Sequence, residues 1–108
     1  MRVKILRLVS ISIFAGLMTA AQAQADGERI YKANCALCHG ADGAANTGVG
    51  KSLHATDLRS EETQKQSDAA LAEVIAKGRG KMPAFGAKLK PDDITQVVAY
   101  IRTLAAKK

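Results

Sequence analysis

Two cysteines and a histidine stand together in a sequence of 108 residues that has no other cysteine. Cys35 and Cys38 are separated by two residues, and His39 follows directly in the stretch NCALCHG. Thiols and an imidazole at this spacing support three different chemistries. The three residues could provide a dithiol that cycles with a disulfide, part of a zinc site, or the covalent attachment point of a haem. The choice among them depends on the rest of the chain.

The first two chemistries lack the context that they require. A redox-active C-x-x-C pair is expected near a βαβ pattern, and the sequence contains no convincing strand. A structural zinc ion needs four ligands, and after residue 25 the chain offers only His54 and carboxylates besides these three residues. Haem attachment is therefore the favoured interpretation.

The C-x-x-C-H pattern is the attachment signature of c-type haem, and its spacing has a physical basis. Residues three apart on a helical turn project from the same side, so Cys35 and Cys38 can each form a thioether with one vinyl group. His39 then lies under the iron, with Nε2 expected to bind the metal and Nδ1–H to donate to a backbone carbonyl. The sequence predicts one haem c, attached through two thioethers, with His39 as the proximal ligand.

The opposite side of the iron needs a ligand from another part of the chain. Met82 is the only methionine after residue 18, and it lies in the segment GRGKMPAFG. Glycine and proline favour an irregular loop there. A lone methionine usually fills a gap in a core, but Met82 has no helical partners, so we interpret it as the second axial ligand. His54 is the rival, although its polar surroundings are typical of a surface residue.

The first 25 residues have the pattern of a secretory signal peptide. Three basic residues precede an uncharged run of 13 residues, LVSISIFAGLMTA, and the small residues AQAQA follow. The run is shorter than the roughly 20 residues of a membrane-spanning helix. We expect cleavage after Ala25, or alternatively after Ala23, with no membrane insertion afterwards. A single domain over residues 26–108 would then reach the periplasm of a Gram-negative bacterium.

The expected mature chain is small and only mildly basic. Its 83 residues carry 13 basic and 10 acidic side chains, a net charge of +3, which is too little to indicate nucleic-acid binding. A domain of this size has a limited core. Its segment 40–66 has no sustained period, and so long a loop is uncommon unless it wraps something. A haem at the centre explains both features.

Three helices are expected around this loop. The first covers about 26–37, with Asp26 as its N-cap and Ile30, Ala33 and Leu37 on one face. The second lies in SDAALAEVIAKG, with Ser67 as its N-cap and Gly78 just past its end, and it has one apolar face made by Leu71, Val74 and Ile75. The third begins at position 91 and carries an apolar stripe made by Ile94, Val97, Val98, Ile101, Leu104 and Ala105. A short turn is expected near 60–65, and the fold class is all-α.

The stretches GERIYKANCALCHG, SDAALAEVIAKG, KMPAF and VVAYIRTL give the chain a family likeness. In this order they resemble class I c-type cytochromes over nearly all of the sequence after residue 25. The resemblance implies the class I cytochrome c fold, in which three main helices and long loops surround one haem. It also implies a close crossing of the first and last helices at Gly27, Tyr31 and Tyr100. Six side chains match positions that pack against the haem, namely Leu53, Leu58, Leu71, Ile75, Pro83 and Phe85.

One feature departs from the family pattern. Class I cytochromes often have Gly-Pro after the proximal histidine, and the proline carbonyl accepts a hydrogen bond from that histidine. This chain has TGVGKSL instead. We expect a carbonyl near Val49 to take over this role.

A His/Met pair fills both axial positions and favours ferrous iron, which raises the reduction potential. The predicted function is therefore electron transfer rather than enzymatic catalysis. The expected partners are redox proteins with acidic docking surfaces, and a monomer is expected. The basic docking patch would consist of Lys77, Arg79, Lys81, Lys88 and Lys90. The alternative is a haem-based gas sensor or ligand-binding protein with a displaceable Met82. A dedicated subunit of a membrane enzyme complex is a third option.

Overall fold

The computed structural model describes residues 15–107, and within this range the chain is helical. One isolated bridge pairs Arg79 with Met82, and there is no β-strand in the described part. The all-α prediction is confirmed. The helices are α1 (Ala15–Asn34), α2 (Ala36–His39), α3 (Gly48–Leu53), α4 (Glu61–Gln64), α5 (Asp68–Lys77) and α6 (Pro91–Leu104), followed by the 3₁₀ turn η1 (Ala105–Lys107).

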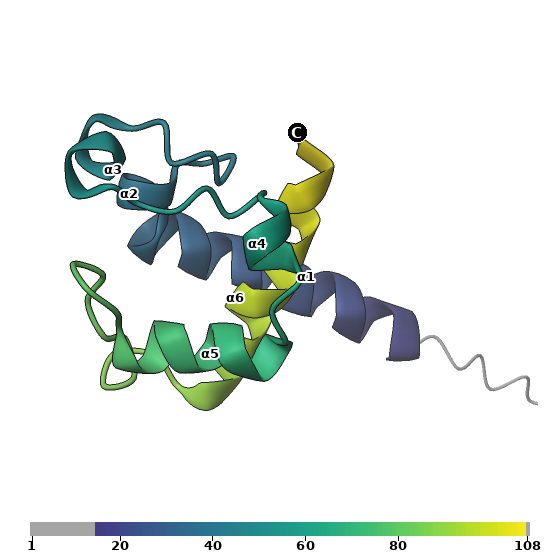
Figure 1. The fold of residues 1–108 in the computed structure, drawn as a ribbon. Helices are drawn as coiled ribbons and strands as arrows, with labels where there is room; N and C mark the ends of the chain where they lie inside the picture. Colours follow the sequence, from purple (N-terminus) through teal and green to yellow (C-terminus); the bar gives the residue numbers. More distant parts are fainter. Residues whose placement is uncertain (1–14, 108) are drawn as a thin grey trace, which may run out of the picture.

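Helices α1 and α6 cross at the centre of the molecule (Figure 1). A Cβ atom at Gly27 would lie 2.3 Å from the Gln96 carbonyl oxygen, so only glycine allows this approach. Tyr31 is completely buried, and its ring centroid lies 5.1 Å from that of Tyr100. Its hydroxyl donates to the Gly40 carbonyl over 2.7 Å, which satisfies the one polar atom of a buried ring. The predicted crossing is confirmed.

Helices α5 and α6 begin as the sequence predicts. The Ser67 hydroxyl accepts from the Ala70 amide at the start of α5, and Pro91 is the first residue of α6. The predicted apolar stripe is buried along α6, and its last member, Ala105, lies in η1 and is half-buried. Ten apolar side chains form this core, namely Ile30, Tyr31, Leu71, Ile75, Ile94, Val97, Val98, Tyr100, Ile101 and Leu104.

The first helix differs from the prediction at both ends. Helix α1 begins at Ala15, so Asp26 lies inside it and is not its N-cap. The chain changes direction at Cys35, and α2 then begins, with the His39 amide donating to the Cys35 carbonyl. Because α2 is a separate helix, the face that begins at Ile30 does not continue to Leu37, which is 70% exposed. Ala33, although it lies in α1, is also exposed.

The segment between α2 and α5 contains more helix than its sequence pattern indicates. The turn expected near 60–65 is α4, capped by the Ser60 hydroxyl. Helix α3 was not expected because GVGKSL lacks an apolar period. Arg102 on α6 fastens the end of this segment, because its guanidinium donates to the Gln64 and Gln66 carbonyls and to the Asp68 carboxylate.

The expected signal peptide falls largely outside the described residues. Residues 1–14 are not described, and α1 runs without a break through both candidate cleavage positions. Among residues 15–107, no helix combines the length and the apolar character that a bilayer crossing requires.

Candidate haem-binding site

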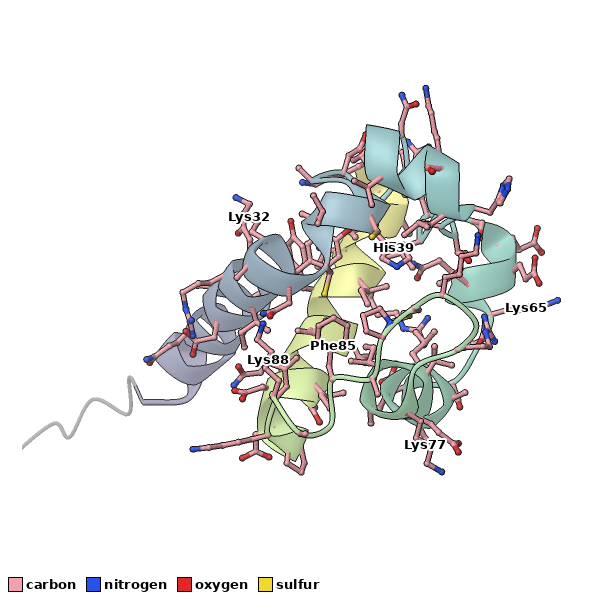
Figure 2. All side chains as sticks on the ribbon, turned by 90° about the vertical axis from the view of Figure 1, so that its left-hand side faces the viewer. Lys32, His39, Lys65, Lys77, Phe85 and Lys88 are labelled. Carbon is pink, nitrogen blue, oxygen red and sulfur yellow. The ribbon has the colours of Figure 1, made fainter. Side chains whose placement is uncertain are left out.

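Two neighbouring cavities, which share several lining residues, lie between α2, α5 and the loop that joins α5 to α6. The outer cavity has a volume of about 430 Å³ and the inner one about 70 Å³. Figure 2 looks at this side of the molecule, with His39 and Phe85 near its middle and Lys65 and Lys77 at the outline. We call the two cavities together the cleft. Residues that line both are Cys35, His39, Thr56, Val74, Arg79 and Met82.

The two cysteines do not have the properties of a redox dithiol. No disulfide joins them. Burial is the main reason that the pKa of the Cys35 thiol is raised to about 11, and the electrostatic effect of Cys38 adds a smaller increase. A reactive C-x-x-C pair needs a lowered pKa, because the thiolate is the nucleophile. Among the described residues, no group of three or more His, Cys, Asp or Glu side chains is placed to hold a metal ion.

Helix α3 and its N-cap pack against residues 35–39, which we call the attachment segment. The Thr47 hydroxyl donates to the Leu37 carbonyl over 2.8 Å and accepts from the Gly50 amide over 2.8 Å. It thereby joins the end of α2 to the start of α3. Gly50 is buried against this junction, where a Cβ atom would lie 2.1 Å from the Cys38 carbonyl oxygen. The position of Cys38 therefore depends on a residue without a side chain at position 50.

Replacing Gly50 with alanine should displace the attachment segment. Overpacking of this kind costs about 1–3 kcal/mol, so we expect Gly50→Ala to lower the free energy of unfolding by that amount. Gly48→Ala in the same helix is the control, because a Cβ atom there meets nothing within 4 Å. Denaturant unfolding of the two variants measures the difference. Equal stabilities would contradict the described packing.

His39 is oriented by a backbone carbonyl. Its Nδ1 lies 2.8 Å from the Thr56 oxygen, and since a carbonyl can only accept, Nδ1 carries a proton, so that in the neutral imidazole Nε2 is the nitrogen with the lone pair. The expectation of a carbonyl near Val49 is wrong. Val49 lies inside α3, where carbonyls point along the helix axis toward the next turn. Thr56 follows this helix in irregular chain, and its carbonyl is free to face the imidazole.

Met82 reaches the cleft from a tight turn between α5 and α6. The amide of Arg79 donates to the Met82 carbonyl, and the amide of Met82 donates to the Arg79 carbonyl. The Phe85 amide donates to the Ile75 carbonyl and fastens this loop to α5. His54 lines the outer cavity, but it is exposed and lies in the left-handed conformation at the end of α3.

The six side chains that match haem-packing positions all reach the cleft. Three of them line the inner cavity, namely Leu58, Leu71 and Ile75, and three line the outer one, namely Leu53, Pro83 and Phe85. Val74 lines both cavities, as its place on the predicted face of α5 allows. Thr56 was missed, because its contribution is a carbonyl and no side-chain pattern indicates one. Arg79 was predicted as a docking residue, and it also borders both cavities.

A covalent haem attachment sequence on an all-α scaffold defines a c-type cytochrome. A family model described as cytochrome c oxidase, cbb3-type, subunit III, matches residues 22–101. The cytochromes c6 of Anabaena variabilis and Microcystis aeruginosa are each 40% identical to this chain, over 77 and 82 residues. These matches cover 70% and 76% of this chain, and 85% and 98% of the two relatives.

Two further matches point the same way. The FixP subunit of the cbb3-type cytochrome c oxidase of Bradyrhizobium diazoefficiens is 38% identical over 86 residues, which cover 78% of this chain and 28% of FixP. The solved structure of the c-type cytochrome KustC0563 matches with a TM-score of 0.68 and 34% identity, covering 73% of this chain and 96% of that one. The chain belongs to the class I c-type cytochromes and carries covalently bound haem c.

The residues present fit this group. The cleft has two thiols for thioether bonds, a histidine with its Nε2 lone pair free, and a thioether on the α5–α6 loop. The remaining lining is largely apolar, which suits a porphyrin face.

Proposed function

We propose that this protein is a periplasmic one-electron carrier whose haem iron is bound by His39 and Met82, and that it is not an enzyme. The observation that carries the proposal is the convergence of Cys35, Cys38, His39 and Met82 on one cleft, with Nδ1 of His39 already occupied by the Thr56 carbonyl. With both axial positions filled, the haem would exchange one electron and offer no open site to oxygen or peroxide.

The chain's own residues have separate tasks in this proposal. Cys35 and Cys38 retain the group covalently, so it is not lost outside the cytoplasm. Thr56 orients His39 through the Nδ1 hydrogen bond. The apolar side chains of the cleft exclude water, and the turn that pairs Arg79 with Met82 holds the thioether in place.

Carbon monoxide separates this proposal from the alternative of a gas sensor or ligand-binding protein. The reduced protein at neutral pH should show the absorption spectrum of low-spin c-type haem, and carbon monoxide should leave that spectrum unchanged. A pyridine haemochrome measurement checks that one haem is attached per chain. Rapid binding of carbon monoxide would favour the sensor and overturn the assignment of Met82 as a permanent ligand.

The proposed docking patch consists of the basic residues that flank Met82 in the sequence. All five of its members are exposed, and Arg79 and Lys81 also line the outer cavity. Lys77 forms an ion pair with Glu73 over 2.9 Å, so its charge is partly compensated. Because the patch borders the cleft, a partner with an acidic surface would be attracted to the side of the molecule where the electron enters or leaves.

The rate of electron transfer to an acidic partner should depend on salt. We expect the rate to fall several-fold between ionic strengths of about 0.01 M and 0.15 M, because the Debye length shrinks from about 30 Å to 8 Å. Lys81→Gln should flatten this dependence, whereas the matched control Lys65→Gln, at an exposed site that lines neither cavity, should not. Stopped-flow kinetics measure the rates. A rate that does not change with salt would remove the docking patch from the proposal.

Export and cleavage at residue 25 are also part of the proposal. They are supported by the basic, apolar and small-residue pattern of the first 25 residues. The intact mass of the exported protein decides between a mature chain that begins at Asp26 and one that begins at Gln24. A mass that includes residues 1–23 would contradict cleavage.

A further inference from the structure

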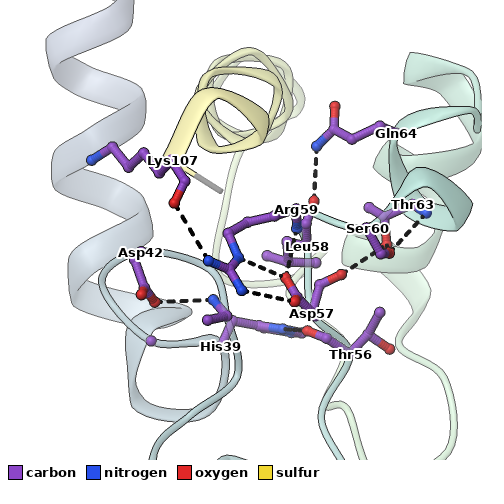
Figure 3. A network of polar contacts seen from close by, with 12 residues as sticks. His39, Asp42, Thr56, Asp57, Leu58, Arg59, Ser60, Thr63, Gln64 and Lys107 are labelled. Atoms are coloured by element: carbon purple, nitrogen blue, oxygen red, sulfur yellow. Dashed lines mark hydrogen bonds and ion pairs between the residues drawn. The ribbon is translucent and has the colours of Figure 1, made fainter.

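An arginine–carboxylate pair lies next to the carbonyl that orients His39 (Figure 3). The Arg59 side chain donates to the Asp57 carboxylate through Nε and through a terminal nitrogen, each over 3.1 Å. The Arg59 amide donates to the same carboxylate over 2.9 Å. Two parallel bonds from a planar guanidinium fix both groups more firmly than a single contact does. This pair, Asp57 with Arg59, is called the clamp below.

The clamp is anchored to the rest of the fold. The other terminal nitrogen of Arg59 donates to the Lys107 carbonyl in η1 over 3.4 Å, and the Arg59 side chain is only 22% exposed. Between the two clamp residues, the Leu58 amide donates to the Gly43 carbonyl over 2.8 Å, and the Leu58 carbonyl accepts from the Gln64 side chain over 2.8 Å. The strip of chain that begins at Thr56 is thus held at several points.

We propose that Arg59, acting through Asp57, is a positioning residue for the proximal histidine. Asp57 follows Thr56 directly, so the clamp limits rotation of the peptide unit whose oxygen accepts from His39. This inference rests on the proposed function, since it requires His39 to be an iron ligand. Arg59 is not among the residues that line the two cavities, so it would act on His39 through Asp57 and the Thr56 carbonyl.

The clamp should influence the reduction potential through the donor strength of the imidazole. A hydrogen bond from Nδ1 to a firmly held carbonyl makes the imidazole a stronger base. A stronger donor favours ferric iron and lowers the potential. A loosened Thr56 carbonyl should therefore raise the potential and let the Nδ1 proton exchange faster with water.

Arg59→Lys is the variant that isolates this effect. Lysine keeps the positive charge but cannot form the two parallel bonds, so a purely electrostatic role predicts no change in potential. We expect a higher potential and several-fold faster exchange of the His39 Nδ1 proton, followed by NMR. Asp57→Asn should shift both quantities in the same direction. The double variant should shift them no further than the larger single change, because both remove one clamp.

Arg102→Lys is the matched control. Arg102 is also an arginine that joins a carboxylate to backbone carbonyls, but the segment it holds is 64–68. This control should lose stability in denaturant unfolding while its potential and its Nδ1 exchange stay unchanged. Equal behaviour of Arg59→Lys and Arg102→Lys, or an Arg59→Lys protein with unaltered potential and exchange, overturns the inference.

The wild-type protein separates failure of this inference from failure of the proposed function. If His39 binds iron, its ring protons show large paramagnetic shifts in the ferric protein. Their absence would overturn the ligand assignment and the inference with it. Their presence, together with an Arg59→Lys protein that does not differ from wild type, would overturn the inference alone.

Discussion

Replacing Met82 with alanine should lower the reduction potential of the protein and let carbon monoxide bind to the reduced form. The expected reason is the loss of the proposed thioether ligand, because a thioether stabilises ferrous iron and would close the second axial position. Axial ligands shift haem potentials over a range of about 0.8 V, so we expect a decrease on the order of 0.1 V or more. A spectroelectrochemical titration measures the potential, and absorption spectroscopy follows carbon monoxide binding.

Two further variants make this result specific to the sulfur atom. Met82→Leu keeps a similar apolar volume, and such exchanges usually cost less than about 1.5 kcal/mol. It should reproduce the lower potential and the carbon monoxide binding without a large loss of stability. His54→Ala removes the rival ligand at the edge of the outer cavity and should change neither. The assignment of Met82 is wrong if the potential follows His54 instead.

Replacing His39 with alanine should abolish the normal holoprotein. The imidazole is the proposed proximal ligand, and its Nδ1 bond to Thr56 fixes the neighbouring attachment segment. Loss of a group that merely orients a ligand costs roughly 10–100-fold in affinity, so removal of the ligand itself should exceed this loss. The yield of covalently attached haem per milligram of exported protein, measured by the pyridine haemochrome method, checks the expectation.

The matched control for this variant is again His54→Ala, which should give a normal yield. The polypeptide of His39→Ala must also be detected immunologically in the exported fraction, so that poor haem attachment is not confused with absent protein. A normal yield of low-spin haem from His39→Ala would show that another residue supplies the proximal ligand.

The chemistry of the site follows from local spacing, and local spacing is what an amino-acid sequence displays directly. The spacing of C-x-x-C-H places two thiols and an imidazole within one helical turn. The glycines and the proline around Met82 exclude a helix and leave a loop free to approach. The apolar period of α6 likewise predicts its buried side, because a helix repeats every 3.6 residues. These three features required no knowledge of distant contacts.

Long-range packing determined the remaining features. The direction change at Cys35 exposes Leu37, although its spacing from Ile30 fits a continuous helix. Helix α3 forms from GVGKSL without an apolar period, because Thr47 caps it and Gly50 allows it to lie against Cys38. The hydrogen-bond partner of His39 is a backbone oxygen 17 positions away. Every residue has a carbonyl, so side-chain identity cannot indicate which one faces the imidazole, and only the path of the folded chain selects Thr56.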